Sequence, residues 1–392
     1  MSGTLTVGPD EQYATIQAAV NAIAPAVDGP VVINVMPGNY NELVTVPEIA
    51  GTSAQNTITL QSSTGNRNDV VIYYDHYTEP AYSDDRMAHE YGVVTLDGID
   101  WFTLKNVTVT TTDVTFPSVI HLRNQSRHCS IDGCHVYSAL STSYSNDINL
   151  IYQYAGSEAN QNNDFMSVTN CLIEGGYYGV RPAGTSYVAL PKQRGCIVSG
   201  NTFRNQGSKG IYNASRDIDL TITNNLFENT ETTAAFQFMD LETGAGLTIS
   251  GNTFIAAIGK KVEVINLRSN TAGTEENPIR IFNNEISLCA SAATSSAINI
   301  NGTTPWLDIA HNTIRVYGQE TTGRGVGIFV NHTNTSDHLT IRANLIVEDE
   351  EGSAIRFYRD NGVTGATLSD NVLHTAGTSL IKTPAVDYST ES

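Results

Sequence analysis

"LTISGNTF" at residues 247–254 is the stretch that decides the fold, because variants of it recur along the chain. The shared form is apolar-x-apolar-x-x-Asn-x-apolar. Its sixth position is occupied by Cys134, Cys171, Asn201, Asn225, Asn252, Asn284, Asn312, Asn344 and Asn371. These positions recur with a period of about 30 residues, and a fixed period of this length indicates a solenoid of stacked coils.

Each repeat predicts a short strand followed by a bend. Apolar and polar residues alternate before the sixth position, which is typical of a strand with one buried face. Asn tolerates the left-handed conformation that a sharp bend requires, and its side chain can bond the backbone. We therefore expect the sixth-position residues to form one inward-facing column whose amides hydrogen-bond from coil to coil. Cys fits this column as a small buried residue.

A second strand lies midway between successive bends, for example "SVIHLRN" at 118–124, "KGIYNAS" at 209–215 and "SAIRFYR" at 353–359. Each coil then has three short strands. The sequence thus predicts an all-β, right-handed parallel β-helix of about 11–12 coils, with residues 1–392 as one domain. The pattern resembles the pectin lyase-like superfamily, which implies a strand pair around a tight Asn bend and a third strand that carries a binding cleft. This fold carries many enzymatic activities and also non-enzymes.

The N-terminal region has its own signals. Residues 11–24 predict a helix, because Ile16, Ala19, Val20 and Ile23 form an apolar stripe at helical spacing. Its expected role is to cover the open end of the first coil. The stretches "ATIQAAV" and "VVINVMPGNYNE" resemble the N-terminus of pectinesterases and of secreted β-helix surface proteins of the Bacteroidetes, and the second likeness continues through residues 46–72.

"GNYNE" at 38–42 matches the Gly-x-Tyr-x-Glu motif of these families, which we interpret as structural. The later pectinesterase motifs that carry two catalytic aspartates have no counterpart in this sequence. Esterase activity is therefore not expected.

Composition limits the partners and the location. The net charge of −19 argues against nucleic acid or an anionic membrane as the main partner. No apolar run reaches membrane-spanning length, so membrane insertion is not expected. "MSGTLTVG" lacks the pattern of a signal peptide. The protein is expected outside the cell or on its surface, with a leader absent from this chain; the alternative is a virion protein that is made in a cytoplasm.

Two further expectations concern the cysteines and the C-terminal end. The five cysteines include no CxxC pair, which favours inert thiols, with all but Cys289 facing the core. One disulfide or a metal site is the alternative. "AVDYSTES" at 385–392 offers no capping element. We therefore expect further domains or a homo-oligomeric partner at this end.

Loops and charge predict a groove. The segments 73–91, 155–165 and 183–195 are long and are expected to wall it. Residues flanking the second apolar position of each midway strand should point outward. Five cations fall in that row, interleaved with aromatic residues: Arg123, Arg181, Arg268, Arg356 and Lys382. This combination suits a polysaccharide or cell-surface glycan of acidic character, because Arg binds carboxylate or sulfate in a fork and Tyr stacks on sugar faces. Solvated charges paired with nearby acids are the alternative.

The candidate site residues follow from this row. The expected substrate-binding residues are Tyr152, Gln237, Asn266, Arg268, Arg356 and Tyr358. If the protein is an enzyme, β-elimination on a uronic-acid polymer is the simplest chemistry, with His121, Tyr152 or Tyr212 as the base and Arg123 and Arg181 neutralising the carboxylate. Asp84, Asp85 and Asp97 are candidate ligands for Ca²⁺. A non-catalytic adhesion module, a polysaccharide lyase and a phage tail-spike-like receptor-binding protein all remain open.

Overall fold

The computed structural model of the chain is all-β, with almost no helix, and its three parallel sheets form a β-solenoid of about 11 turns. This confirms the predicted fold class. The structure describes residues 1–75, 92–112, 118–141, 148–154, 161–184, 191–230, 236–256, 262–268, 272–290, 294–302, 304–318, 324–332, 337–349, 351–377, 379–385 and 387–388. Two compact units divide the chain: unit 1 is Met1–Thr202 and unit 2 is Phe203–Ser392.

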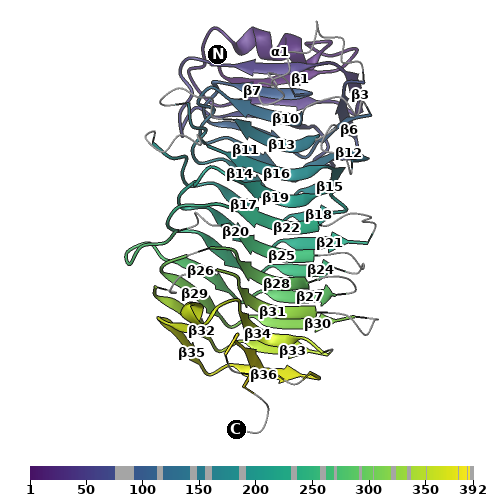
Figure 1. The fold of residues 1–392 in the computed structure, drawn as a ribbon. Coiled ribbons are helices and arrows are strands. Elements are labelled where there is room, and N and C mark those ends of the chain that lie inside the picture. The colour runs from purple at the N-terminus through teal and green to yellow at the C-terminus, as the bar shows by residue number, and fades with distance from the viewer. Residues whose placement is uncertain are drawn as a thin grey trace, which may run out of the picture. The chain divides into compact units, whose positions relative to one another are not determined.

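In unit 1 each coil contributes one strand to each of three sheets, A, B and C (Figure 1). Sheet A contains β1 (Gly3–Val7), β2 (Val31–Val35), β5 (Ile58–Ser62), β8 (Phe102–Lys105), β11 (Ser130–Asp132), β14 (Ser167–Thr169) and β17 (Ile197–Ser199). Sheet B contains β3 (Gly38–Asn41), β6 (Val70–Tyr73), β9 (Thr108–Thr111), β12 (His135–Leu140) and β15 (Leu172–Gly176). Sheet C contains β4 (Val44–Pro47), β7 (Val94–Asp97), β10 (Ser118–Arg123), β13 (Asn149–Tyr154) and β16 (Tyr178–Ala183).

Unit 2 repeats this arrangement. Sheet A contains β20 (Thr221–Thr223), β23 (Thr248–Ser250), β26 (Ile279–Phe282), β29 (Leu307–Ala310), β32 (Leu339–Arg342) and β35 (Ala366–Ser369). Sheet B contains β18 (Thr202–Arg204), which begins at the unit boundary, β21 (Leu226–Asn229), β24 (Thr253–Ala256), β27 (Glu285–Cys289), β30 (Thr313–Tyr317), β33 (Leu345–Glu348) and β36 (Val372–Thr375). Sheet C contains β19 (Lys209–Asn213), β22 (Phe236–Leu241), β25 (Val262–Leu267), β28 (Thr294–Ile300), β31 (Arg324–Val330), β34 (Ser353–Phe357), β37 (Ile381–Lys382) and the antiparallel β38 (Asp387–Tyr388). A 3₁₀ helix, η3 (Asp360–Val363), follows β34.

The core of each coil comes from the apolar positions of the repeat. In the stretch 247–254, Leu247, Ile249 and Phe254 are fully buried and Asn252 is nearly so, while the four residues between them are at least partly exposed. Phe227 and Phe254 stack in successive coils, with ring centroids 4.9 Å apart and planes 13° apart. Full burial of such a side chain contributes about 1.5–3 kcal/mol. The period-2 pattern thus becomes a continuous apolar column because every coil adds one layer in register.

The predicted amide column is present in unit 2. Asn225, Asn252, Asn284, Asn312, Asn344 and Asn371 form a continuous ladder, in which each Nδ2 donates to the Oδ1 of the next Asn at 2.9–3.0 Å. Each accepting Oδ1 also receives the backbone N–H of the preceding Asn. The second Nδ2 proton reaches a carbonyl of the previous coil, as from Asn252 to Ile222. Every polar atom of an inner rung therefore has a partner.

The left-handed residue of the bend lies one position before the column, which corrects the expectation that the column Asn itself is left-handed. Positive φ values of 52–69° occur at Gly133, Asn170, Gly200, Asn224, Gly251, Asn283, His311, Ala343 and Asp370. Gly and Asn dominate this position because they adopt left-handed φ at low energy. The turn made there directs the next side chain into the core.

In unit 1 two rungs of the column are thiols. Cys134 Sγ lies 3.5 Å from the Leu104 carbonyl, and Cys171 Sγ lies 3.4 Å from the Ile131 carbonyl. Asn201 Nδ2 makes the equivalent bond to Val168. All five cysteines are free and buried, Cys289 included, which was not expected to face the core. Burial raises the pKa of the Cys129 thiol to about 12 and that of Cys171 well above its usual range. These cysteines are structural donors.

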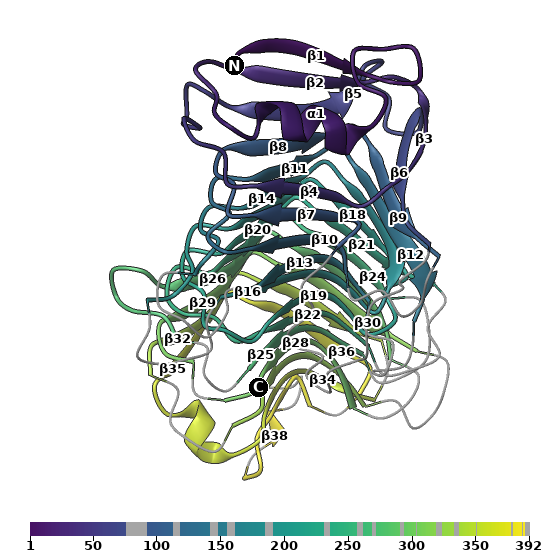
Figure 2. The ribbon, with the colours of Figure 1, turned by 90° about the horizontal axis from the view of Figure 1, so that it is seen from above.

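The N-terminal helix α1 (Ile16–Ile23) is shorter than predicted. It begins at Ile16 because Thr15 is the N-cap, and its hydroxyl accepts the Ala18 N–H at 3.1 Å. Glu42, the last residue of the Gly-x-Tyr-x-Glu motif, accepts the N–H groups of Ile16 and Gln17 at 2.9 and 3.0 Å. The motif therefore anchors α1, which packs against β1 and β4 at the N-terminal end of unit 1 (Figure 2). In the part of the chain described, no helix is long and apolar enough to cross a membrane.

Candidate functional site

Strand register fixes the outward row of sheet C in unit 1. Thr95, His121, Tyr152 and Arg181 are successive partners on β7, β10, β13 and β16. Arg123 pairs with Asp97 one pleat further along. Three of the residues predicted for substrate contact or chemistry thus share one row, as the repeat alignment implied.

His121 and Tyr152 face away from the core but are not exposed. The exposed fraction is 0% for His121 and 4% for Tyr152. The Tyr152 ring stacks on the imidazole at 5.2 Å between centroids, and the Arg181 guanidinium lies 4.9 Å from the Tyr152 ring centroid. The expectation that the row lies open to solvent therefore fails for these two side chains, because neighbouring coils stack large groups over them. Their predicted role as a base would require the stack to open.

Arg123 is engaged by an acid within its own row. Its Nη2 lies 2.8 Å from Asp97 Oδ2, and Asn124 Nδ2 donates to Asp97 Oδ1 at 2.7 Å. Partial burial acts to raise the pKa of Asp97, but the bonds from Arg123 and Asn124 and the positive charge hold that pKa below its usual value. This arrangement matches the alternative in which the outward arginines are paired with acids.

The predicted walls and calcium ligands fall mostly elsewhere. Asp84 and Asp85 lie outside the described residues, as do most of the segment 73–91 and residues 155–160 and 185–190. Within the described ranges no three His, Cys, Asp or Glu side chains gather as a metal site. The calcium site and the groove walls remain predictions.

The outward row of sheet C in unit 2 is equally well defined. Its successive partners are Tyr212, Asp240, Asn266, Asn299, Phe329, Arg356 and Lys382. Met239 pairs with Ile211 and Ile265 in the core and is fully buried. Gln237 belongs to a neighbouring row and donates from Nε2 to Glu263 Oε2 at 2.6 Å.

At the start of this row the charges neutralise one another. Lys209 contacts the buried carboxylate of Asp240, and Arg268 Nε lies 3.9 Å from the same carboxylate. Arg268 Nη1 also donates to the Tyr212 hydroxyl at 3.2 Å, and Lys209 Nζ lies 4.3 Å from the Tyr212 ring centroid. Partial burial lowers the pKa of Arg268, but the charge of Asp240 and the contacts with Tyr212 outweigh it and raise that pKa. Two of the predicted site residues, Arg268 and Tyr212, therefore belong to a closed ionic network.

At the end of the row the cations are differently placed. Five residues form what we call the C-terminal basic–aromatic cluster: Phe329, Arg356, Tyr358, Arg359 and Lys382. The Arg356 guanidinium lies 5.4 Å from the Phe329 ring centroid, and that of Arg359 lies 4.8 Å from the Tyr358 centroid. Within the described residues neither guanidinium forms an ion pair. Tyr358 is 45% exposed.

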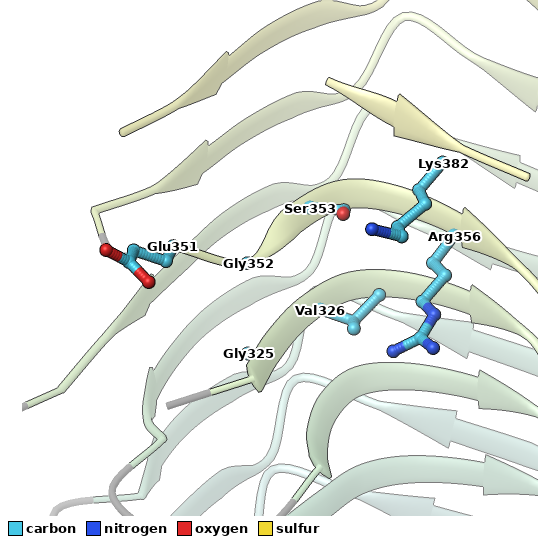
Figure 3. Close-up of a pocket in the computed structure, with 7 residues that line it drawn as sticks. All are labelled: Gly325, Val326, Glu351, Gly352, Ser353, Arg356 and Lys382. Atoms are coloured by element: carbon cyan, nitrogen blue, oxygen red, sulfur yellow. The ribbon is translucent and has the colours of Figure 1, made fainter. Parts of the chain in front are cut away.

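A pocket of about 340 Å³ adjoins this cluster, within unit 2. It is lined by Gly325, Val326, Glu351, Gly352, Ser353, Arg356 and Lys382. In Figure 3 the Lys382 and Arg356 side chains extend into the pocket region from neighbouring strands, and Glu351 lies on the opposite side. Sequence analysis included both cations but missed Arg359 and Ser353. Arg359 directly follows Tyr358 in "RFYR", so the alternation of charge and ring was the available signal.

Comparison with known proteins supports the fold. No family model matches the chain, and no curated protein matches it. Among solved structures, PfbA, a surface adhesin of Streptococcus pneumoniae, has a TM-score of 0.53 at 12% identity over 96% of this chain and 92% of that one. Pectate lyase Pel9A (TM-score 0.46, 11% identity, 81% and 78%) and a pectin methylesterase from carrot (0.42, 13%, 83% and 86%) also match. The likeness concerns the fold alone, which is a parallel β-helix.

Proposed function

We propose that the protein is a non-catalytic carbohydrate-binding module that holds an acidic polysaccharide at the C-terminal basic–aromatic cluster. The observation that carries this proposal is the surroundings of the Arg356 and Arg359 guanidinium groups. Both lie over aromatic rings, and Arg356 also lines the pocket. In the described chain neither guanidinium forms an ion pair, although the net charge is −19.

The chemistry of this cluster suits a sugar acid. A guanidinium presents a planar fork of donors that matches a carboxylate, and stacking on a ring fixes the plane of that fork. The exposed face of Tyr358 offers a surface for a sugar ring. The surface adhesin with a similar fold supports a role as a surface or extracellular binding protein, which is part of the proposal.

Titration calorimetry tests this function. The wild-type protein should bind an oligomer of galacturonic acid, with an affinity that falls as salt rises. The double variant Arg356→Ala/Arg359→Ala should lose about tenfold or more in affinity, because a charge-assisted hydrogen bond contributes about 1.5–3 kcal/mol. Arg280→Ala removes one positive charge from an exposed position on sheet A and is the control for losing an arginine outside the cluster. Equal affinities of the double variant and this control would overturn the proposal.

A lyase is a second candidate, because Tyr212 lies between Lys209 and Arg268. Its hydroxyl accepts a hydrogen bond from Arg268, and a phenol is one of the groups that can act as the base in β-elimination. The same oligomer tests it: a lyase would produce the ultraviolet absorbance of an unsaturated uronate, and Tyr212→Phe would remove that signal. Binding without such absorbance leaves the non-catalytic function.

A further inference from the structure

A second ladder of polar side chains runs along the outside of sheet C in unit 2. Asn266 Nδ2 donates to Asp240 Oδ1 at 2.8 Å, and Asn299 Nδ2 donates to Asn266 Oδ1 at 2.9 Å. All three residues are buried, with exposed fractions of 4%, 4% and 1% for Asp240, Asn266 and Asn299. The three lie on successive strands at one position of the row.

The direction of this ladder is fixed by its first member. Asp240 meets the ammonium of Lys209, and an ionised carboxylate only accepts hydrogen bonds. Asn266 must therefore turn its Nδ2 toward Asp240 and its Oδ1 toward the next coil, and Asn299 must do the same. The ladder consequently delivers an acceptor, and never a donor, at its far end.

That terminal acceptor is unused. Asn299 Oδ1 is buried and has no hydrogen-bond partner in the described structure. The next residue of the row is Phe329, whose ring has no donor, and the residue after it is Arg356. A buried polar group without a partner is uncommon and calls for a ligand or an ordered water. The acceptor of Asn299 and the donors of Arg356 thus flank one aromatic side chain.

We propose that Asn299, Phe329 and Arg356 form a recognition site for one sugar-acid unit, with Phe329 as a movable cover. This deepens the proposed function and rests on it. When the ring swings out, Asn299 Oδ1 accepts a sugar hydroxyl while the guanidinium of Arg356 binds the carboxylate of the same unit. The ligand class is therefore a hydroxylated carboxylate, such as a uronic-acid residue. A carboxylate polymer without hydroxyl groups would satisfy Arg356 but not Asn299.

Two substitutions of Phe329 test whether Asn299 takes part in binding or whether Arg356 binds the glycan without it. Phe329→Ala and Phe329→Asn both remove the ring and its contact with Arg356. Only the asparagine can extend the ladder, because its Nδ2 would donate to Asn299 Oδ1 as Asn299 donates to Asn266. The probes are an oligomer of galacturonic acid and an oligoacrylate with the same number of carboxylates, each titrated by calorimetry.

We expect Phe329→Asn to bind the galacturonate oligomer about tenfold more weakly than Phe329→Ala. Both variants should bind oligoacrylate equally. Phe329→Asn should also melt at a higher temperature than Phe329→Ala, because the new asparagine would donate a hydrogen bond to the buried Asn299 Oδ1. Equal galacturonate affinities of the two variants, or coincident melting curves, would overturn the inference.

The outcomes distinguish this inference from the proposed function. If Arg356→Ala weakens both probes while the two Phe329 variants behave alike, glycan binding stands and the role of Asn299 is wrong. If the wild-type protein binds neither probe, the proposed function fails, and this inference fails with it.

Discussion

Units 1 and 2 use the same repeat but satisfy it with different chemistry. In unit 2 six amides form an unbroken ladder, from Asn225 to Asn371. In unit 1 the described column contains Cys134 and Cys171, whose thiols make longer contacts with the same kind of carbonyl. The same contrast holds for the outward row: Arg123 in unit 1 pairs with Asp97, while Arg356 in unit 2 forms no ion pair among the described residues. Stability and binding capacity are therefore unevenly distributed, and three experiments test that difference.

The largest expected effect is on the amide ladder. Asn252→Leu keeps the branched shape of the side chain but removes two bonds given by Nδ2 and two received by Oδ1. We expect a loss of about 3 kcal/mol in the free energy of unfolding, because buried partners are left unsatisfied. Cys171→Ala removes only weak thiol bonds and should lose about 1 kcal/mol. Urea unfolding of both variants measures the difference, and equal losses would show that the thiol and amide rungs are equivalent.

The column of sixth-position residues was predictable because the sequence repeats with a fixed period. The position of the left-handed residue in the bend was not predictable. Asn224 and Asn225 are both asparagines, as are Asn283 and Asn284, so residue type alone does not say which one turns and which one points inward. The backbone decides: the first of each pair has positive φ, and the second carries the ladder.

The site was predicted in outline for a similar reason. Alternation along a strand identifies which side chains leave the core, and it placed His121, Arg181 and Arg356 correctly in outward rows. Exposure depends on the coils above and below, which are about 30 residues away in sequence. The covering of His121 by Tyr152 and the pairing of Arg123 with Asp97 therefore came only from the register of neighbouring strands.

A smaller effect is expected at the bend. Ala343 has φ of 52°, a region that costs a residue with a Cβ roughly 1–2 kcal/mol. The equivalent positions of unit 1 are Gly133, Asn170 and Gly200, which adopt it more easily. Ala343→Gly should therefore stabilise unit 2 by up to about 1 kcal/mol, after the greater chain entropy of glycine in the unfolded state is subtracted.

Gly251→Ala is the converse variant for this bend. It should destabilise, because an added Cβ would lie 2.4 Å from Asn224 Oδ1. Thermal melts that showed both changes in the same direction would contradict the assignment of the left-handed position.

The smallest expected effect lies in unit 1 and depends on pH. The pKa of Asp97 is depressed in the folded protein, despite partial burial, by Arg123 and Asn124. A carboxyl with a lowered folded pKa contributes stability above its unfolded pKa of about 3.9, and that contribution disappears as pH falls through the folded value. Arg123→Ala should therefore reduce the free energy of unfolding at pH 7 by less than about 1 kcal/mol, since the pair is partly solvated. The difference from wild type should shrink toward zero as pH falls from 7 to an acidic value below the folded pKa of Asp97, where the carboxyl is protonated. Denaturant titrations at the two pH values measure this. Arg280→Ala is the control, because Arg280 is an exposed arginine that forms no ion pair within the described part of the chain. A loss that stayed constant between the two pH values would mean that Arg123 stabilises unit 1 through the packing of its alkyl chain, and that the charge of Asp97 plays no part.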